Sequence, residues 1–251
     1  MGGADSDVAP SGRLTLPVQL LLAFVAGVLY PLAFAPFHLW PLTFASAAVL
    51  FWLLSRAEGQ MLLLAWVFGL GKYAVGVSWI YVSIHQYGGA SPLLAGAMVT
   101  VFVAFMALFC LPIGWFLGKL KASNQHISKS ALAMGFVATW VLMEWMLTWF
   151  LTGFPWLFAG HAMLGTPLQG YAPVIGTFGL SLVVMTITAA AMLSADQAQT
   201  SRVRIGTAGV VLVLVGLGIS LDTQVWTKPT GRYEAGLVQG NIDQAIKWDA
   251  D

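Results

Sequence analysis

The chain has 251 residues, of which 59% are hydrophobic and only 8% are charged, and its formal net charge is +1. Ordinary globular domains carry about 25% charged residues, so a water-soluble fold of this length would lack the charge to cover its surface. The near-neutral balance also argues against a nucleic-acid partner, which would normally meet a basic patch. The composition therefore indicates a protein embedded in membrane lipid.

The first apolar segment, residues 17–36, is long enough to span a membrane. Within it, Ala33–Ala35 (AFA) resembles the small-x-small cleavage site of a secretory signal peptide. Pro36 would directly follow that cut, however, and further apolar segments come after it. We therefore expect a retained first helix, preceded by a cytoplasmic tail at residues 1–16.

Further apolar segments follow in chain order at residues 40–55, 60–84, 91–118, 130–151, 167–193 and 204–221. A spanning helix needs about 20 residues, so the segment 40–55 is short and is expected to be tilted, shallow or paired in a hairpin with the first. The pattern predicts an all-α polytopic bundle of about seven transmembrane helices over residues 17–222.

Lysine and arginine are distributed unevenly between the two sets of loops. With the N-terminus inside, the inside loops contain Arg13, Arg56, Lys119, Lys121, Lys129, Arg202 and Arg204. The opposite short loops, near 37–39, 85–90 and 152–166, contain none. Because positive charge is retained on the cytoplasmic side, the first set is expected to face the cytoplasm. An odd number of spans then delivers the tail, from about Asp222 onward, to the outside.

The tail changes character after the last apolar segment. Lys228–Gly231 is typical of a linker, Tyr233–Val238 (YEAGLV) of a strand and Gln239–Asn241 of a turn. So few residues cannot bury a core of their own. Residues 231–251 are therefore expected to be either an appendage or the beginning of a soluble domain that is cut short.

Aromatic residues and histidines gather in the loops predicted to face outward. They are found in Phe37–Trp40 (FHLW), Ile84–Gly89 (IHQYGG) and Thr152–Trp156 (TGFPW), and His161 follows. An aromatic belt at the membrane surface is the simpler interpretation for most of them. The histidine spacing matches no compact ligand pattern and no cysteine or carboxylate accompanies it, so no metal site is predicted.

No catalytic set is recognisable within the chain. It has no glycine-rich phosphate loop, no nucleophile elbow and no paired histidine motif. Its single cysteine, Cys110, lies in an apolar run where lipid surroundings would suppress thiolate formation. We interpret Cys110 as a packing residue.

Lys72 and Glu144 are the only charged residues deep inside the predicted spans. Counted from the cytoplasmic ends of their helices, they lie roughly 18 Å and 21 Å along the axis at 1.5 Å per residue. Charges at such depth usually pair or face the bundle interior, so we predict a structural ion pair between them. The alternative is that Lys72 extends along a lipid-facing groove while Glu144 is protonated or bonded to a hydroxyl.

Five stretches of the sequence resemble, in family order, the bacterial apolipoprotein N-acyltransferases. They are Ala33–Pro41 (AFAPFHLWP), Ser78–Gly89 (SWIYVSIHQYGG), Thr152–Leu157 (TGFPWL), Pro167–Gly176 (PLQGYAPVIG) and Leu237–Asp249 (LVQGNIDQAIKWD). The last stretch resembles the opening strand and turn of the family's nitrilase-like domain. The resemblance therefore implies that residues 231–251 begin a periplasmic nitrilase-like (carbon-nitrogen hydrolase) domain.

The resemblance implies an enzyme of the bacterial inner membrane that uses no cofactor. Such enzymes take an acyl chain from a phospholipid donor onto a cysteine of the outer domain. They pass it from this thioester to the N-terminal diacylglyceryl-cysteine of an apolipoprotein acceptor. By resemblance, Trp156 matches a tryptophan that lines the lipid entrance, and Trp248 matches one that helps to shape the active site.

The sequence departs from the family pattern at the catalytic residues. The family's glutamate base, lysine and cysteine all come later than residue 251, and Glu234, Lys247 and Cys110 match none of them. The chain also has Leu147 where family members often carry an arginine three residues after the glutamate that corresponds to Glu144. We therefore predict no catalytic residue within these 251 residues and no activity for them alone.

Two other functions are compatible with parts of the pattern. A transporter would be expected to show inverted repeats and polar residues around a midplane site. No repeat is apparent in the sequence. A truncated, non-catalytic membrane scaffold would agree with the missing catalytic residues.

The predicted topology can be tested by cysteine labelling in a Cys110→Ala background. A cysteine at Gln86 should react with a membrane-impermeant maleimide in intact spheroplasts, and one at Gln125 should not, because the charge bias places them on opposite sides. Reaction of the cysteine at position 125 together with no reaction at position 86 would contradict the predicted orientation.

Overall fold

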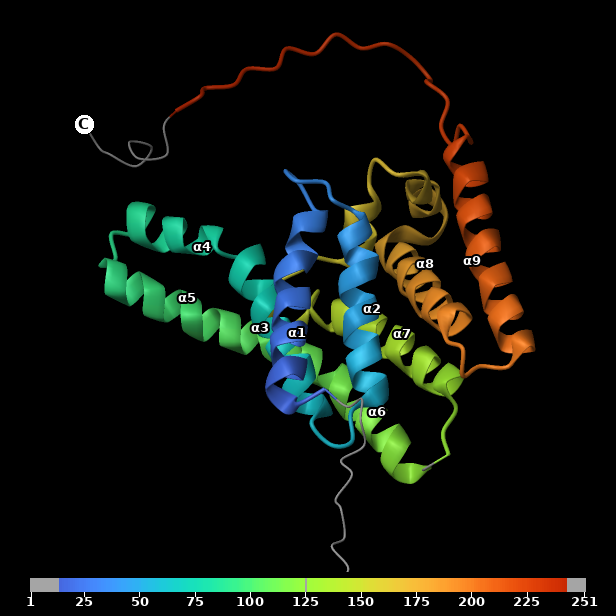
Figure 1. Ribbon diagram of the computed structural model, residues 1–251. Helices are drawn as coiled ribbons and strands as arrows, with labels where there is room; N and C mark the ends of the chain where they lie inside the picture. Colours follow the sequence, from blue (N-terminus) through green and yellow to red (C-terminus); the bar gives the residue numbers. More distant parts are fainter. Residues whose placement is uncertain (1–13, 125, 243–251) are drawn as a thin grey trace, which may run out of the picture.

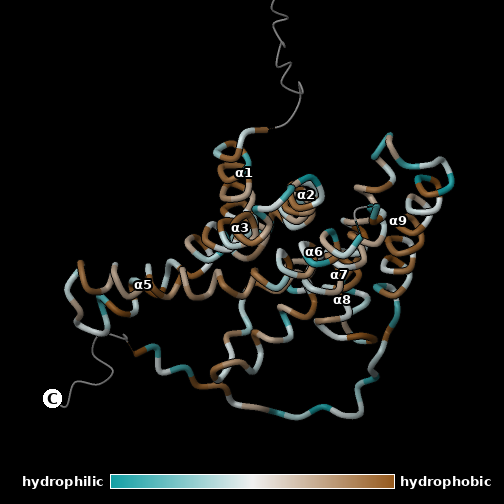
Figure 2. Tube along the Cα trace, turned by 90° about the horizontal axis from the view of Figure 1, so that it is seen from below, coloured by the Kyte–Doolittle hydropathy of each residue, from teal (hydrophilic) through white to brown (hydrophobic). Residues whose placement is uncertain are grey.

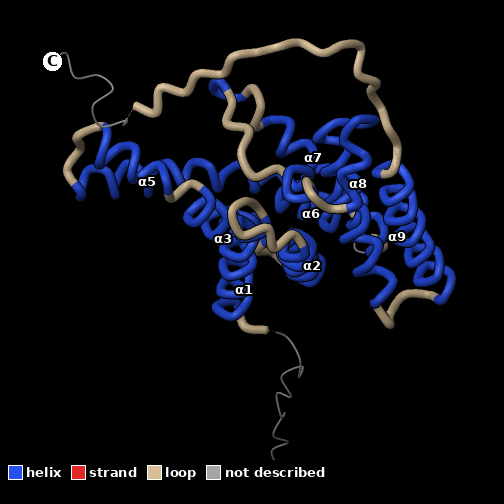
Figure 3. The backbone as a smooth tube through the Cα atoms, turned by 90° about the horizontal axis from the view of Figure 1, so that it is seen from above, coloured by secondary structure: helices blue, strands red, loops and turns tan. Residues whose placement is uncertain are grey.

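The computed structural model describes residues 14–124 and 126–242, and all regular structure in this part of the chain is helical (Figures 1 and 3). The helices are α1 (Leu16–Leu29), α2 (Pro41–Arg56), α3 (Met61–Gly76), α4 (Trp79–Val82), α5 (Pro92–Ala107), α6 (Leu111–Ser123), α7 (Lys129–Met146), α8 (Ala172–Ala195) and α9 (Ser201–Asp222). Every predicted apolar segment overlaps at least one of them. Short 3-10 turns and one π-helical turn, Ser83–Tyr87, join several helices.

The helices have the length and apolar character of a membrane bundle. Among the described residues, four stretches are long and apolar enough to cross a membrane: Leu16–Ala33, Pro92–Ser123, Pro167–Ala195 and Ser201–Asp222. A fifth is added if Met61–Gly76 and Trp79–Tyr87, which are bent by 51°, form one span. Figure 2 shows hydrophobic residues along the helices and hydrophilic residues mainly in the connections. A membrane-type helical bundle is thus confirmed, whereas seven spans remain a prediction.

Prolines mark where several of these helices begin. A proline at the first or second position opens α1, α2, α5, α6 and α8. Proline suits this position because its missing N–H would have no intrahelical partner there and its φ is already helical. Pro112 accordingly separates α5 from α6 at the 3-10 turn Leu108–Cys110, within what the sequence presents as one apolar segment.

Glycines allow α1 and α3 to pack with their backbones in close contact. A Cβ atom on Gly27 would lie 2.1 Å from the Phe68 carbonyl oxygen, and one on Gly71 would lie 2.3 Å from the Phe24 carbonyl oxygen. Lipid tails are as apolar as leucine, so membrane helices gain association from such close packing rather than from the hydrophobic effect. The α1–α3 pair is therefore tightly packed.

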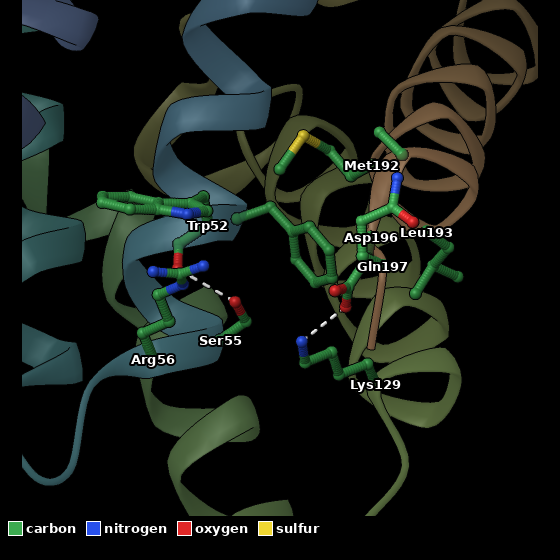
Figure 4. A pocket seen from close by; sticks show the side chains of 10 residues that line it. Trp52, Ser55, Arg56, Lys129, Met192, Leu193, Asp196 and Gln197 are labelled. Carbon is green, nitrogen blue, oxygen red and sulfur yellow. Dashed lines mark hydrogen bonds and ion pairs between the residues drawn. The ribbon is translucent and has the colours of Figure 1, made fainter. Parts of the chain in front are cut away.

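The ends of α2 and α8 and the start of α7 meet at one end of the bundle, which we call the basic end. They enclose a pocket of about 370 Å³ whose walls include Arg56, Lys129 and Asp196. Figure 4 shows the Arg56 guanidinium beside the Trp52 ring, 4.6 Å from its centre, and Lys129 directed at Asp196, with 2.5 Å between nitrogen and oxygen. The hydrogen bond from Lys129 lowers the pKa of the Asp196 carboxyl to about 2. Two loops that the sequence analysis assigned to the same side of the membrane, those with Arg56 and Lys129, therefore lie side by side.

Residues 224–242 leave the bundle without forming a helix or a strand (Figures 1 and 3). The strand predicted at Tyr233–Val238 is absent, and Val238 is 97% exposed. An extended segment becomes a strand only when a neighbouring strand supplies hydrogen bonds, and no strand is present in the described residues. The nitrilase-like domain predicted at 231–251 thus remains a prediction, and its last nine residues lie outside the described part.

Lys121 closes the end of α2 from the neighbouring helix α6. Its Nζ donates hydrogen bonds to the carbonyl oxygens of Leu54, Ser55 and Ala57 at 3.2, 2.7 and 2.9 Å. The last carbonyls of a helix have no intrahelical partner, and a cation there also complements the helix dipole. Lys121 thereby links the ends of two helices.

Replacing Lys121 by methionine should lower the free energy of unfolding by about 1–2 kcal/mol, because three carbonyl groups lose a charged donor. Unfolding of the chain in detergent micelles would measure this change. Lys119→Met is the matched control, since Lys119 lies exposed on the same helix. Equal stability of the two variants would contradict the capping role.

Candidate functional site

The candidate site lies at the opposite end of the bundle, where α3 breaks into α4. Helix α3 ends at Gly76, whose carbonyl is one of the acceptors that a helix end leaves free. Trp156, far away in the sequence, donates its Nε1–H to this oxygen at 3.1 Å. A Cβ atom at Gly76 would lie 2.3 Å from Cδ1 of Leu157, so a larger residue there would displace the Leu157 side chain. We call this the aromatic end.

The loop that carries Trp156 has a strained backbone. Leu151, Thr152 and Leu157 have φ angles of 47°, 76° and 59°, in the left-handed region that residues other than glycine rarely adopt. Gly153, at 84°, continues the same turn. Strain of this kind persists only where surrounding contacts hold the loop in place, and it is found preferentially at functional sites.

Four aromatic side chains form what we call the aromatic cluster: Trp79, Phe102, Phe154 and Trp156. The ring centres of Trp79 and Trp156 lie 5.6 Å apart, those of Phe154 and Trp156 5.8 Å, and those of Phe102 and Phe154 5.4 Å. These side chains come from α4, α5 and the strained loop. Trp79 is 46% and Trp156 42% exposed, so the cluster presents apolar faces to its surroundings. Half-exposed tryptophans suit a boundary where one end meets hydrocarbon and the other meets polar groups.

An arm made of α4, the π-helical turn and α5 extends from the cluster away from α1 and α2, as Figures 1 to 3 agree. Its large apolar side chains are open to the surroundings: Leu93 is 86% and Val101 69% exposed. Apolar surface of this extent is stable in contact with lipid tails or with a lipid-bearing ligand. The aromatic cluster thus lies at the base of a lipophilic arm.

The three histidines of the predicted outer loops do not come together as a ligand set. His85 Nδ1 lies 2.8 Å from the Ala90 carbonyl oxygen and helps to close the turn of the arm. His161 stacks on Phe158 with ring centres 5.4 Å apart, and burial lowers the pKa of its imidazole, which favours the neutral form. No group of three or more potential metal ligands is found among the described residues.

Four further site residues were suggested by the sequence: Trp156, Trp248, Lys72 and Glu144. Trp156 belongs to the aromatic cluster, while Trp248 lies outside the described residues. Lys72 and Glu144 are both 0% exposed, but among the described residues Lys72 Nζ has no hydrogen-bonding partner, so no hydrogen bond joins the two there. A structural ion pair without a direct hydrogen bond stays a prediction. Glu144 Oε1 instead accepts hydrogen bonds from Trp140 Nε1 and from the backbone N–H of Ala159, both at 2.8 Å.

Sequence reasoning did not single out Trp79 or Phe102 as partners of Trp156. The signal for Trp79 was present, since it lies within the stretch SWIYVSIHQYGG, whereas Phe102 lies in an ordinary apolar run. Cys110, interpreted as a packing residue, is fully buried.

Comparisons with known proteins show which proteins this chain is similar to. Residues 26–190 match the family model described as apolipoprotein N-acyltransferase N-terminal domain. The chain is 41% identical over 233 residues to the apolipoprotein N-acyltransferase of Pseudomonas syringae pv. tomato, covering 91% of this chain and 45% of that protein. It is 39% identical to that of Azotobacter vinelandii (92% and 45%) and 38% identical to that of Coxiella burnetii (92% and 47%). The chain therefore spans about half the length of these relatives.

The hydrogen bond from Trp156 to α3 can be tested with Trp156→Phe, which keeps an aromatic ring and removes the donor. In lipid nanodiscs, the free energy of unfolding should fall by about 1 kcal/mol, which is the usual net contribution of a hydrogen bond. Trp115→Phe on α6 is the control, because Trp115 is 55% exposed and lies outside the cluster. If both variants behave alike, the Gly76–Trp156 contact does not fix the loop.

Proposed function

Because the chain belongs to the apolipoprotein N-acyltransferase family, we propose that it forms the membrane-embedded part of an enzyme that acylates bacterial lipoproteins. The enzyme would lie in the inner membrane, with the basic end of the bundle in the cytoplasm and the aromatic end facing the periplasm. The distribution of lysine and arginine supports this orientation.

The aromatic cluster at the base of the exposed apolar arm is the observation that carries the proposal. Both substrates, a phospholipid acyl donor and a diacylated apolipoprotein acceptor, would be held in the membrane by acyl chains. They would reach the enzyme sideways, through lipid, rather than from water. Half-exposed tryptophans such as Trp79 and Trp156 offer rigid apolar faces to those chains.

The chemistry would take place in two acyl transfers. A cysteine thiolate attacks the donor ester, which forms a thioester and releases a lysophospholipid. The free α-amino group of the lipoprotein's N-terminal cysteine then attacks the thioester, which forms an amide and regenerates the thiol. Covalent catalysis of this kind divides one difficult transfer into two easier ones.

We assign this chemistry to the part of the relatives that the chain does not span. Cys110 is unsuited to be the nucleophile because it is 0% exposed inside the bundle. The role of residues 17–222 would be to admit the two lipid-bearing substrates and to orient them toward a catalytic domain that follows the tail. The tail leaves from the aromatic end, where Asp222 at the end of α9 accepts a hydrogen bond from Gln169 at 3.0 Å.

A chimera tests the proposal. This chain would replace the corresponding half of the Pseudomonas aeruginosa relative, to which it is 39% identical over 234 residues. We expect the purified chimera to transfer an acyl chain from phosphatidylethanolamine to a synthetic diacylated lipopeptide, and the 251-residue chain alone to show no transfer.

Two results would contradict the proposal. A folded chimera without transfer would show that this membrane part does not serve the reaction. Transfer by the 251-residue chain alone would show that the chemistry lies within it. The unmodified relative is the positive control for both measurements.

A further inference from the structure

Lys72 is a basic residue whose side-chain nitrogen is enclosed by aromatic rings inside the bundle. It is 0% exposed, and its Nζ lies 4.7 Å from the ring centre of Tyr30, 5.3 Å from that of Tyr73 and 5.5 Å from that of Trp140. Aromatic faces attract a cation within about 6 Å, most strongly when water is excluded. The rings thus take the place of hydrogen-bonding partners, of which Lys72 Nζ has none in the described structure.

Trp140 contacts both buried charges, each with a different part of its ring. Lys72 lies over the ring, while the indole N–H donates to Glu144 Oε1 at 2.8 Å. The face of an aromatic ring is negative and its edge positive, so both charges meet the part of the indole that attracts them. A carboxylate bonded to the N–H also polarises the ring toward a more negative face, which strengthens its attraction for Lys72.

Glu144 connects this arrangement to the loop of the candidate site. The same Oε1 accepts the backbone N–H of Ala159, three residues after Trp156. The next amide, that of Gly160, donates to Ser181 Oγ of α8, also at 2.8 Å. Two buried side chains from different helices therefore bind consecutive amides, and the strained loop is held directly before them.

We propose that Lys72 and Glu144 are joined through the indole of Trp140, and that this buried relay positions the loop that carries Trp156. Lys72 keeps a carboxylate stable in an apolar interior, and the carboxylate binds the Ala159 amide more tightly than a neutral acceptor would. Glu144 is thus a positioning residue rather than a catalytic one. Its consequence for turnover rests on the proposed function, whereas the relay itself does not.

The position of the loop can be followed with a reporter cysteine at Ala162, which is 5% exposed, in a Cys110→Ala background. In the 251-residue chain in nanodiscs, Glu144→Ala should speed maleimide labelling of this cysteine by about tenfold or more, because the amide clamp is lost. Thr139→Val is the matched control. Thr139 is buried on the same helix, but within the described part of the chain its hydroxyl donates only to carbonyl oxygens of α7. Equal labelling in both variants would overturn the positioning role.

A double-mutant cycle tests the link between the two charges. Lys72→Met and Glu144→Gln each leave one charge alone in the bundle, so each should lower Tm by about 5 °C or more. The double variant removes both charges, so its Tm should fall by less than that of either single variant. Losses that simply add would show that the two side chains are independent.

Repeating the cycle with Trp140→Phe separates the relay from a direct attraction between the charges. Phenylalanine keeps a ring face near Lys72 but has no N–H for Glu144. The relay predicts that the coupling falls by at least half in this background, whereas unchanged coupling would overturn the role of the indole.

Turnover in the chimera distinguishes this inference from the proposed function. Glu144→Ala should lower the rate of acyl transfer. The double variant Lys72→Met/Glu144→Gln should keep a higher rate of transfer than Glu144→Gln alone. An inactive chimera whose reporter labelling still follows Glu144 would refute the proposed function and leave the relay standing. An active chimera that Glu144→Ala does not slow would refute the positioning of the loop.

Discussion

The burial of Lys72, which shares the apolar interior with the buried Glu144, constrains the packing of this bundle. An ammonium group removed from water must find compensation within a few ångströms, and the apolar helices around it offer few polar atoms. Tyr30 of the α1 end, Tyr73 of α3 and Trp140 of α7 surround it. The close approach of α1 and α3 through Gly27 and Gly71 brings the end of α1, where Tyr30 lies, beside α3.

The same constraint connects the interior of the bundle to its aromatic end. Glu144 lies one helical turn after Trp140 and receives both the indole N–H and the amide of Ala159. The loop from Phe150 to Phe158 is strained, and strained backbone persists only when its contacts outweigh the cost. One of these contacts is Trp156 on the free carbonyl of Gly76, and another is the amide clamp on Glu144. The surface that we propose for lipid substrates is thereby supported from within.

Local properties of the sequence predicted much of the fold. Apolar blocks predicted the helices, and the placement of Arg56 and Lys129 predicted loops that the structure brings together at the basic end. The burial of Lys72 and Glu144 was also predictable, since both interrupt apolar runs. The sequence did not predict which neighbouring groups compensate these two buried side chains. Trp140 is one of many aromatic residues in apolar helices, and only the three-dimensional packing shows that its ring meets one charge and its N–H the other. The strand expected at Tyr233–Val238 is absent because pairing, rather than composition, makes a strand.

The indole proton of Trp140 provides the most direct measurement of the central claim, that a charged hydrogen bond at Trp140 joins the interior to the loop. In a 15N-tryptophan-labelled chain in nanodiscs, this resonance would be assigned by its loss in Trp140→Phe. We predict a strongly downfield proton shift, protection from exchange with D2O over hours, and an upfield movement in Glu144→Gln, because hydrogen bonds to a carboxylate are shorter and stronger than those to an amide. Exchange within minutes, or a shift that Glu144→Gln leaves unchanged, would contradict the account.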